Sequence, residues 1–202
     1  MSCEGMRRPM IGCSKSALKV VVIAVLPILL VFAANSRANG QEPTHALLGK
    51  PAPFFSIRSG DDETLVPEMF RGKVAVIFYE TREASRKNSD IKDRFNKLYD
   101  GQDEAVRRSI VRIPVINCSR VVWPVTAVWK QSLRYHSKRV GITLYGDWDG
   151  RMAKDYRMKD GDSNLIIIDR EGIIRYVSVG RITGQQFLEI EQLLDTLVNR
   201  EK

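Results

Sequence analysis

Short apolar runs recur along the chain and predict the strands of a sheet. Val74–Tyr79 is apolar, β-branched and aromatic throughout, which is typical of a strand buried on both faces. Leu165–Asp169 and Ile173–Val179 flank the tight turn Arg170–Gly172, so these two runs are expected to form an antiparallel hairpin. Two further strands are expected at Ser109–Asn117 and Ile142–Tyr145.

Between these runs, apolar residues recur at helical spacing. Ile91, Phe95 and Leu98 lie on one side of Ser85–Tyr99, which predicts an amphipathic helix. A capping box of Thr183 and Gln186 predicts the start of a last helix. The inner face of that helix is Phe187, Ile190, Leu194, Leu197 and Val198. Two more helices are expected, one at Val122–Ser137 and a brief one that ends at Tyr156. The apolar stripe of the first is Val125, Val128, Trp129 and Leu133.

The order of these elements defines the fold class. Helices between successive strands imply parallel crossovers, and the hairpin near the C-terminus adds an antiparallel edge. The prediction is an α/β fold, a three-layer sandwich in which a mixed central sheet carries helices on both faces. Pro114 indicates an edge position or an irregularity in its strand. A chain of 202 residues is long enough for one such domain with a well-buried core.

The N-terminal segment has the layout of a signal peptide. Val20–Ala34 is apolar, basic residues precede it, and Ser36-Arg37-Ala38 is a candidate cleavage site. The run is shorter than the roughly 20 apolar residues that a bilayer requires. We therefore expect a signal peptide or, as the weaker alternative, an N-terminal membrane anchor at 1–38, a linker at 39–47 and a domain at 48–202. The positive flank predicts export, to the periplasm or to the outer side of the inner membrane.

Charge and composition exclude some partners. The net charge of +8 falls to +4 when the segment up to Ala38 is set aside, because that segment holds five basic residues and one acidic residue. No nucleic-acid motif or basic surface with interleaved aromatic residues is present, so nucleic-acid binding is not expected. The expected partners are envelope proteins, with the membrane contacted through the N-terminal segment alone.

Three segments resemble the thioredoxin-like superfamily, in the branch shared by peroxiredoxins and exported thiol oxidoreductases. They are Gly49-Lys50-Pro51-Ala52-Pro53-x-Phe55, Gly72-Lys73 before the first buried strand, and Leu165–Gly172. The resemblance covers Leu48–Leu197. Within the superfamily the chain is most similar to the periplasmic YtfJ-like proteins, which share the signal peptide and the absent redox pair. The resemblance implies the thioredoxin-like sandwich and a location in the cell envelope.

The residues that would carry thiol chemistry in this superfamily are replaced. The Cys-x-x-Cys pair, whose helix N-terminus lowers the thiol pKa, corresponds to Glu83-Ala84-Ser85-Arg86. Thr81 matches the threonine of peroxiredoxins, but alanine stands three residues later where they have cysteine. Ser163-Asn164 occupies the place of the family's cis-proline. Thr81, Glu83, Ser85, Arg86 and Ser163 thus define a degenerate thioredoxin site.

Few other residues offer chemistry. Cys3 and Cys13 precede the apolar run, so Cys118 is the lone thiol of the predicted domain, without an internal disulfide. It is a candidate redox residue, although a small buried residue is the favoured interpretation. No metal or cofactor is expected from the two histidines, His45 and His136.

Two local clusters have a structural and a functional interpretation. Asp147-Trp148-Asp149-Gly150 has carboxylates in a loop, but its spacing does not fit a calcium-binding loop, and a turn is favoured. The aromatic residues Trp123, Trp129, Trp148 and Tyr135 are expected to pack in or near the core rather than to mark a partner surface.

The predicted function is that of a non-catalytic binding or accessory protein of the cell envelope. The alternative is a thiol-dependent antioxidant or oxidoreductase that uses Cys118 with an outside resolving partner. A third hypothesis is a membrane-anchored structural component.

Overall fold

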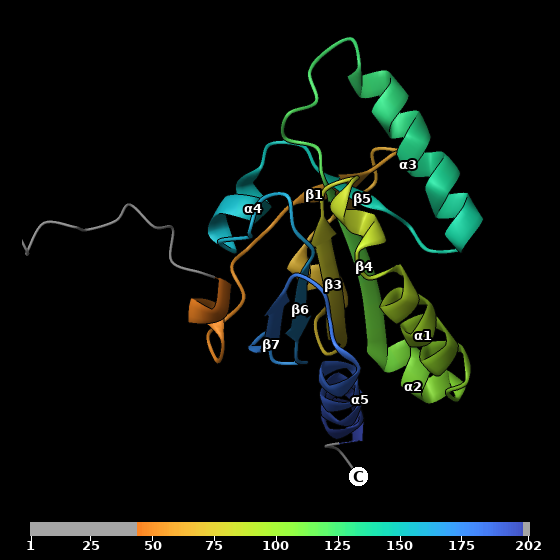
Figure 1. Ribbon diagram of the computed structural model, residues 1–202, viewed down its shortest axis with the longest axis vertical. Helices are drawn as coiled ribbons and strands as arrows, with labels where there is room; N and C mark the ends of the chain where they lie inside the picture. The colour runs from red at the N-terminus through yellow and green to blue at the C-terminus, as the bar shows by residue number, and fades with distance from the viewer. Residues whose placement is uncertain (1–43, 200–202) are drawn as a thin grey trace, which may run out of the picture. The chain divides into compact units, whose positions relative to one another are not determined.

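Seven strands form one mixed sheet in the computed structural model, which describes residues 44–199. Their order across the sheet is β2-β1-β5-β4-β3-β6-β7 (Figure 1). The strands are β1 (Ile57–Ser59), β2 (Thr64–Leu65), β3 (Val74–Glu80), β4 (Ile110–Asn117), β5 (Tyr145–Asp147), β6 (Asn164–Ile168) and β7 (Ile174–Val179). The predicted signal peptide or anchor and the first part of the predicted linker lie outside the described residues.

Helices follow or precede most strands. They are α1 (Ser89–Asp100), α2 (Glu104–Ser109), α3 (Thr126–Val140), α4 (Arg151–Asp155) and α5 (Gly184–Asn199), with 3-10 helices η1 (Thr44–Leu47), η2 (Pro67–Phe70) and η3 (Ala84–Arg86). The predicted capping box of α5 is present, because the Thr183 amide donates to Gln186 Oε1 and the Gln186 amide donates to Thr183 Oγ1. In the described part of the chain, no helix is long and apolar enough to cross a membrane.

The central strand β3 has only buried residues. It pairs in parallel with β4 and antiparallel with β6, so neither of its edges is open. Core residues cover both of its faces, and this position requires the continuous apolar run seen in the sequence. The strand predicted at Val74–Tyr79 is therefore confirmed. Glu80, its last residue, carries a charge yet is only 3% exposed.

Two hydrophobic cores cover the two faces of the sheet. On one face, α1 and α5 pack against β3 and β6 through Phe95, Phe187 and Ile190. On the other face, α4 and the N-terminal segments contribute Met152 and Leu47. The helices α1 and α4 lie on opposite sides of the sheet (Figure 1). The three-layer α/β sandwich with a mixed sheet is thus confirmed.

The strand β4 has two different halves. All seven residues from Ile110 to Ile116 pair with β3, but β5 pairs only with Val115–Asn117. Pro114 lies directly before the pairing with β5 begins, beside the stretch that has no strand partner on that side. A residue without an N–H is tolerated at such a place. The predicted irregularity at Pro114 therefore lies at the point where pairing between β4 and β5 ends.

Several boundaries differ from the sequence predictions. The helix expected from Ser85 begins at Ser89, because Asn88 has φ −117° and its side chain bonds to distant backbone groups instead of capping the helix. The strand expected at Ile142–Tyr145 lies at β5, three residues further on. The short β1–β2 pair and α2 were not predicted, and the end of the predicted linker forms η1.

The apolar stripe predicted for α3 is wrong in part. Leu133 is buried, but Val125 and Val128 are exposed. The helix begins four residues later than expected, at Thr126, and contacts the rest of the domain through another side. Periodicity identified the helix but not the direction in which it packs.

Candidate functional site

Four of the five residues of the predicted degenerate thioredoxin site, Thr81, Glu83, Ser85 and Arg86, lie between the end of β3 and the start of α1, and Ser163 directly precedes β6. Thr81 Oγ1 accepts a hydrogen bond from the Ala84 amide at 3.2 Å, and Ser85 Oγ donates to the Arg82 carbonyl at 2.7 Å. Ala84, Ser85 and Arg86 form η3, and the side chains of Glu83 and Arg86 are exposed. Local hydrogen bonds therefore shape this turn, and α1 begins only after it.

Beneath the turn, Glu80 and Ser163 are brought together. Ser163 Oγ donates to Glu80 Oε1 at 2.7 Å, and Lys92 Nζ donates to Glu80 Oε2 at 2.8 Å. Lys92 also donates to the Ser85 carbonyl at 2.5 Å. Both oxygens of the buried carboxylate thus have partners, one of them a cation, as a buried charge requires.

Asn88 joins this cluster to the segments that flank the hairpin of β6 and β7. Its Nδ2 donates to Ser163 Oγ at 3.0 Å and to the Gly180 carbonyl at 2.8 Å, while its Oδ1 accepts from the Ile182 amide at 2.9 Å. We call Glu80, Asn88, Lys92 and Ser163 the buried polar network. It links β3, α1 and the segments that flank the hairpin of β6 and β7.

Asp162 adds a second charged cluster beside this network. It pairs with Lys87 and, at 3.1 Å, with Lys159. Burial opposes ionisation of Asp162, but the hydrogen bonds from Lys87, the Ser163 amide and Lys159 outweigh it and lower the pKa of this carboxyl. The carboxylates of Glu80 and Asp162 are therefore both held by lysines.

The sequence placed some of these residues and missed others. Ser163 was predicted to belong to the degenerate site, and its side chain hydrogen-bonds to Glu80 and Asn88. The sequence analysis did not predict a role for Asn88 or Lys92. A glutamate that ends a wholly apolar strand was the available signal, because a buried carboxylate must find a partner.

Cys118 lies away from this network, at the end of β4. Its side chain is 0% exposed. Burial, with a smaller contribution from the charge of Asp147, raises the pKa of the thiol to about 12. At neutral pH the group is therefore a thiol and not the thiolate that reacts.

Asp147, in the predicted carboxylate loop, is buried and structural. Its Oδ2 accepts from the Tyr79 hydroxyl and the Ala153 amide, each at 3.0 Å. Burial raises the pKa of Asp147 and, with the nearby carboxylate, that of Tyr79 as well. Asp149 Oδ1 accepts from the Arg151 amide, as in a simple turn. Across residues 44–199, no group of three or more His, Cys, Asp or Glu side chains could hold a metal ion.

The aromatic residues and histidines fall in different places. Trp123 is 87% exposed, so the expectation of core packing is wrong for this residue. Trp148 donates from Nε1 to the Arg58 carbonyl at 3.2 Å. Tyr135 is exposed, so the expectation is wrong for this residue too, and its ring packs edge-on against His136. His45 is exposed.

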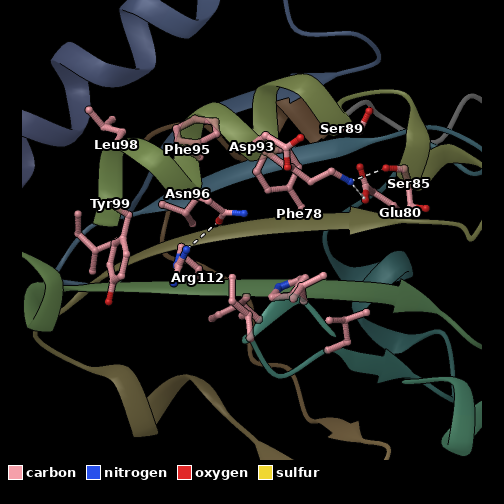
Figure 2. Close-up of a pocket in the computed structure, with 18 of the residues that line it drawn as sticks. Phe78, Glu80, Ser85, Ser89, Asp93, Phe95, Asn96, Leu98, Tyr99 and Arg112 are labelled. Carbon is pink, nitrogen blue, oxygen red and sulfur yellow. Dashed lines mark hydrogen bonds and ion pairs between the residues drawn. The ribbon is translucent and has the colours of Figure 1, made fainter. Parts of the chain in front are cut away.

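A cavity of about 620 Å³ opens next to the buried polar network. It extends between α1 and α3 over β4, and Figure 2 shows Glu80 and Ser85 near one end and Tyr99 and Arg112 near the other. Trp129 and His136 line it from α3. We call it the α1–α3 groove. Its volume is in the range of about 300–1,000 Å³ that small-molecule sites occupy.

The sheet and its layers define a thioredoxin-like fold, and a buried polar network lies at the end of its central strand β3. No protein-family model matches the sequence, and no curated protein matches it.

Solved structures with this fold do match. A candidate thiol:disulfide interchange protein, DsbE, of Chlorobium tepidum is 16% identical, with a TM-score of 0.55 over 74% of this chain and 97% of its own. A candidate thiol-disulfide oxidoreductase of Bacteroides vulgatus is 23% identical, with a TM-score of 0.54 over 75% and 96%. The exposed lipoprotein thioredoxin of Streptococcus pneumoniae is 16% identical, with a TM-score of 0.53 over 72% and 100%. At these identities the similarity concerns the fold alone.

Proposed function

We propose that this chain is an exported thioredoxin-like protein that acts by binding, as an accessory protein of the cell envelope, and not by thiol–disulfide exchange. The observation that carries the proposal is the buried polar network at the old redox site. Thiol exchange needs a nucleophilic thiolate at the start of a helix and a second thiol to resolve the mixed disulfide. Here a turn with Glu83 and Arg86 stands in that place, above the lysine-paired carboxylate of Glu80.

The location of the protein belongs to the same proposal. The N-terminal apolar run with its basic flank supports export, as does the resemblance to periplasmic YtfJ-like proteins. One structural neighbour is an exposed lipoprotein. Mass spectrometry of the mature protein tests this part, because an N-terminus near Asn39 indicates a cleaved signal, whereas an intact N-terminus indicates an anchor.

The alternative, a lone-thiol enzyme that uses Cys118, has less support. A peroxidatic or exchanging thiol must reach its substrate and must ionise near neutral pH. Cys118 is fully buried, and its pKa is raised to about 12. The groove offers no substitute thiol, because none of its lining residues is a cysteine.

Labelling of Cys118 in the folded protein tests the proposal. A variant with Cys3→Ser and Cys13→Ser leaves Cys118 as the only thiol, and a maleimide reagent is added near neutral pH with and without denaturant. We expect labelling only after unfolding, and insulin reduction no faster than with dithiothreitol alone. Cys118→Ser in the same background is the control for background labelling. Rapid labelling of the native protein, or insulin turnover lost in Cys118→Ser, would support the lone-thiol enzyme instead.

A further inference from the structure

The α1–α3 groove has an apolar floor and walls. Phe78 of β3, Pro114 and Ile116 of β4, Leu98 of α1, and Trp129 and Leu133 of α3 line it. Most of these side chains are buried or half-buried in the free protein. A groove of this composition gains free energy by taking up an apolar group, at about 25 cal/mol per Å² removed from water.

The groove exists because β5 is short. The first part of β4 has no strand on its β5 side. The helix α3 is held instead by the turn that follows β1. Arg134 Nη1 donates to the Gly60 carbonyl at 2.8 Å, and Lys130 Nζ pairs with Asp62 at 2.6 Å. These contacts fix α3 against the β1 end of the sheet, so α3 does not close over β4 toward α1. The space is therefore part of the fold.

Arg112 places a fixed positive charge in the groove. Its guanidinium lies 3.9 Å from the centre of the Tyr99 ring, and Nη1 donates to Asn96 Oδ1 at 2.7 Å. Figure 2 shows Arg112 rising from β4 toward Asn96, with Tyr99 beside it. Among the described residues, no carboxylate lies within salt-bridge distance of Arg112. Stacking and one hydrogen bond thus orient this cation without neutralising it.

Other charges around the groove favour an anion. Glu80 is paired with Lys92 and adds no free negative charge. The remaining charged lining residues are the cations Arg82, Arg86 and Arg139 and the acids Asp93 and Asp195. Together with Arg112 the lining has an excess of positive charge. Arg is well suited to bind a carboxylate, because its planar N–H donors match the two carboxylate oxygens.

We propose that the α1–α3 groove binds an anionic amphiphile of the fatty-acid class, with its carboxylate on Arg112 and its apolar tail along Ile116, Trp129 and Leu133. This inference rests on the proposed binding function and names the class of ligand. An extended peptide that adds to the open edge of β4 fits less well, because Pro114 has no N–H to offer a new strand.

Calorimetric titration of the mature protein with dodecanoate below its critical micelle concentration tests the proposal. We expect saturable binding at one site. Arg112→Gln should weaken binding by about tenfold or more, since a hydrogen bond to a charged group contributes about 1.5–3 kcal/mol. Arg94→Gln is the matched control, because Arg94 also lies 3.9 Å from a ring centre, that of Phe187, but does not line the groove. It should bind dodecanoate like the unaltered protein.

A second variant separates the tail from the head group. Ser132→Phe places a ring into the groove without changing any charge, and it should abolish binding. Dodecanol, which has the tail without the charge, should bind as weakly to the unaltered protein as dodecanoate binds to Arg112→Gln. A lysophosphatidic acid with the same tail distinguishes a phosphate head from a carboxylate, and tighter binding of it would overturn the fatty-acid class.

Absence of saturable dodecanoate binding, or equal binding by Arg112→Gln, overturns the proposal. Displacement of dodecanoate by a peptide but by no other amphiphile would assign the groove to a protein segment instead. None of these results changes the labelling of Cys118, so failure of this inference is distinguishable from failure of the proposed function.

Discussion

Removal of the lysine from the buried polar network gives the sharpest test of what holds the end of β3 in place. In Lys92→Met the apolar stem is kept and the ammonium group is lost. Glu80, whose side chain is 4% exposed, is then left with the Ser163 hydroxyl as its donor. Breaking a buried ion pair by removing one partner typically costs about 3–5 kcal/mol. Because Lys92 is 26% exposed and water can replace part of its contact, we expect a loss of about 2–3 kcal/mol.

Urea unfolding of the purified protein near neutral pH measures this loss. Glu80→Gln should cost less, about 1 kcal/mol, because Lys92 keeps its hydrogen bond to the Ser85 carbonyl and is partly exposed to solvent. The double variant Glu80→Gln, Lys92→Met should be more stable than the sum of the two losses predicts, by about 1–2 kcal/mol, because no unpaired carboxylate then remains. Lys97→Met, at an exposed position of the same helix, should stay within about 0.5 kcal/mol of the unaltered protein.

A deficit of Lys92→Met below about 1 kcal/mol near neutral pH would contradict the assignment of Glu80 and Lys92 as a buried ion pair.

Two further predictions concern the scaffold around the site. Burial raises the pKa of Asp147, against the hydrogen bonds from Ala153 and Tyr79. The contribution of Asp147 to stability is therefore present at acidic pH and is lost as the pH rises through its folded pKa. The loss is about 1.4 kcal/mol for each tenfold difference in proton affinity between the folded and unfolded protein. Asp147→Asn should accordingly gain stability relative to the unaltered protein from acidic to neutral pH in thermal unfolding, and a constant difference would refute this. Gly60→Ala places a Cβ 2.5 Å from the Lys130 carbonyl and should cost about 1–3 kcal/mol in urea unfolding through overpacking. The control Gly184→Ala meets no atom within 4 Å, and equal stability of the two variants would show that α3 is not held at Gly60.

The sequence was sufficient to predict the layers of the fold. Three local patterns allowed a single prediction each, and each prediction is confirmed. They are the buried run at β3, the hairpin of β6 and β7 and the cap of α5. The short strands β1 and β2 have too few residues to show a period, and α2 is a single short helix capped by Asp103. Such elements depend on tertiary contacts more than on pattern.

For the candidate site, the sequence indicated the segment after the first buried strand but not the contacts that its residues make. The contacts that fill the site join Glu80 to Ser163, 83 residues later, and Asn88 to Ile182, 94 residues later. No local pattern specifies such pairs. The groove was likewise beyond prediction, because it depends on where β5 stops pairing with β4 and on which side of α3 meets the sheet.

The turn after β3 and the buried polar network do not provide the surroundings of a reactive thiol. A reactive thiol needs positive charge nearby and free N–H donors at the start of its helix. Here the Ala84 amide already bonds to Thr81, and the ammonium group of Lys92 is committed to Glu80 and the Ser85 carbonyl. A cysteine introduced in this turn would lie near the carboxylate of Glu80, which opposes formation of a thiolate. Glu80 and Lys92 line the α1–α3 groove, so this network forms a fixed end of the groove.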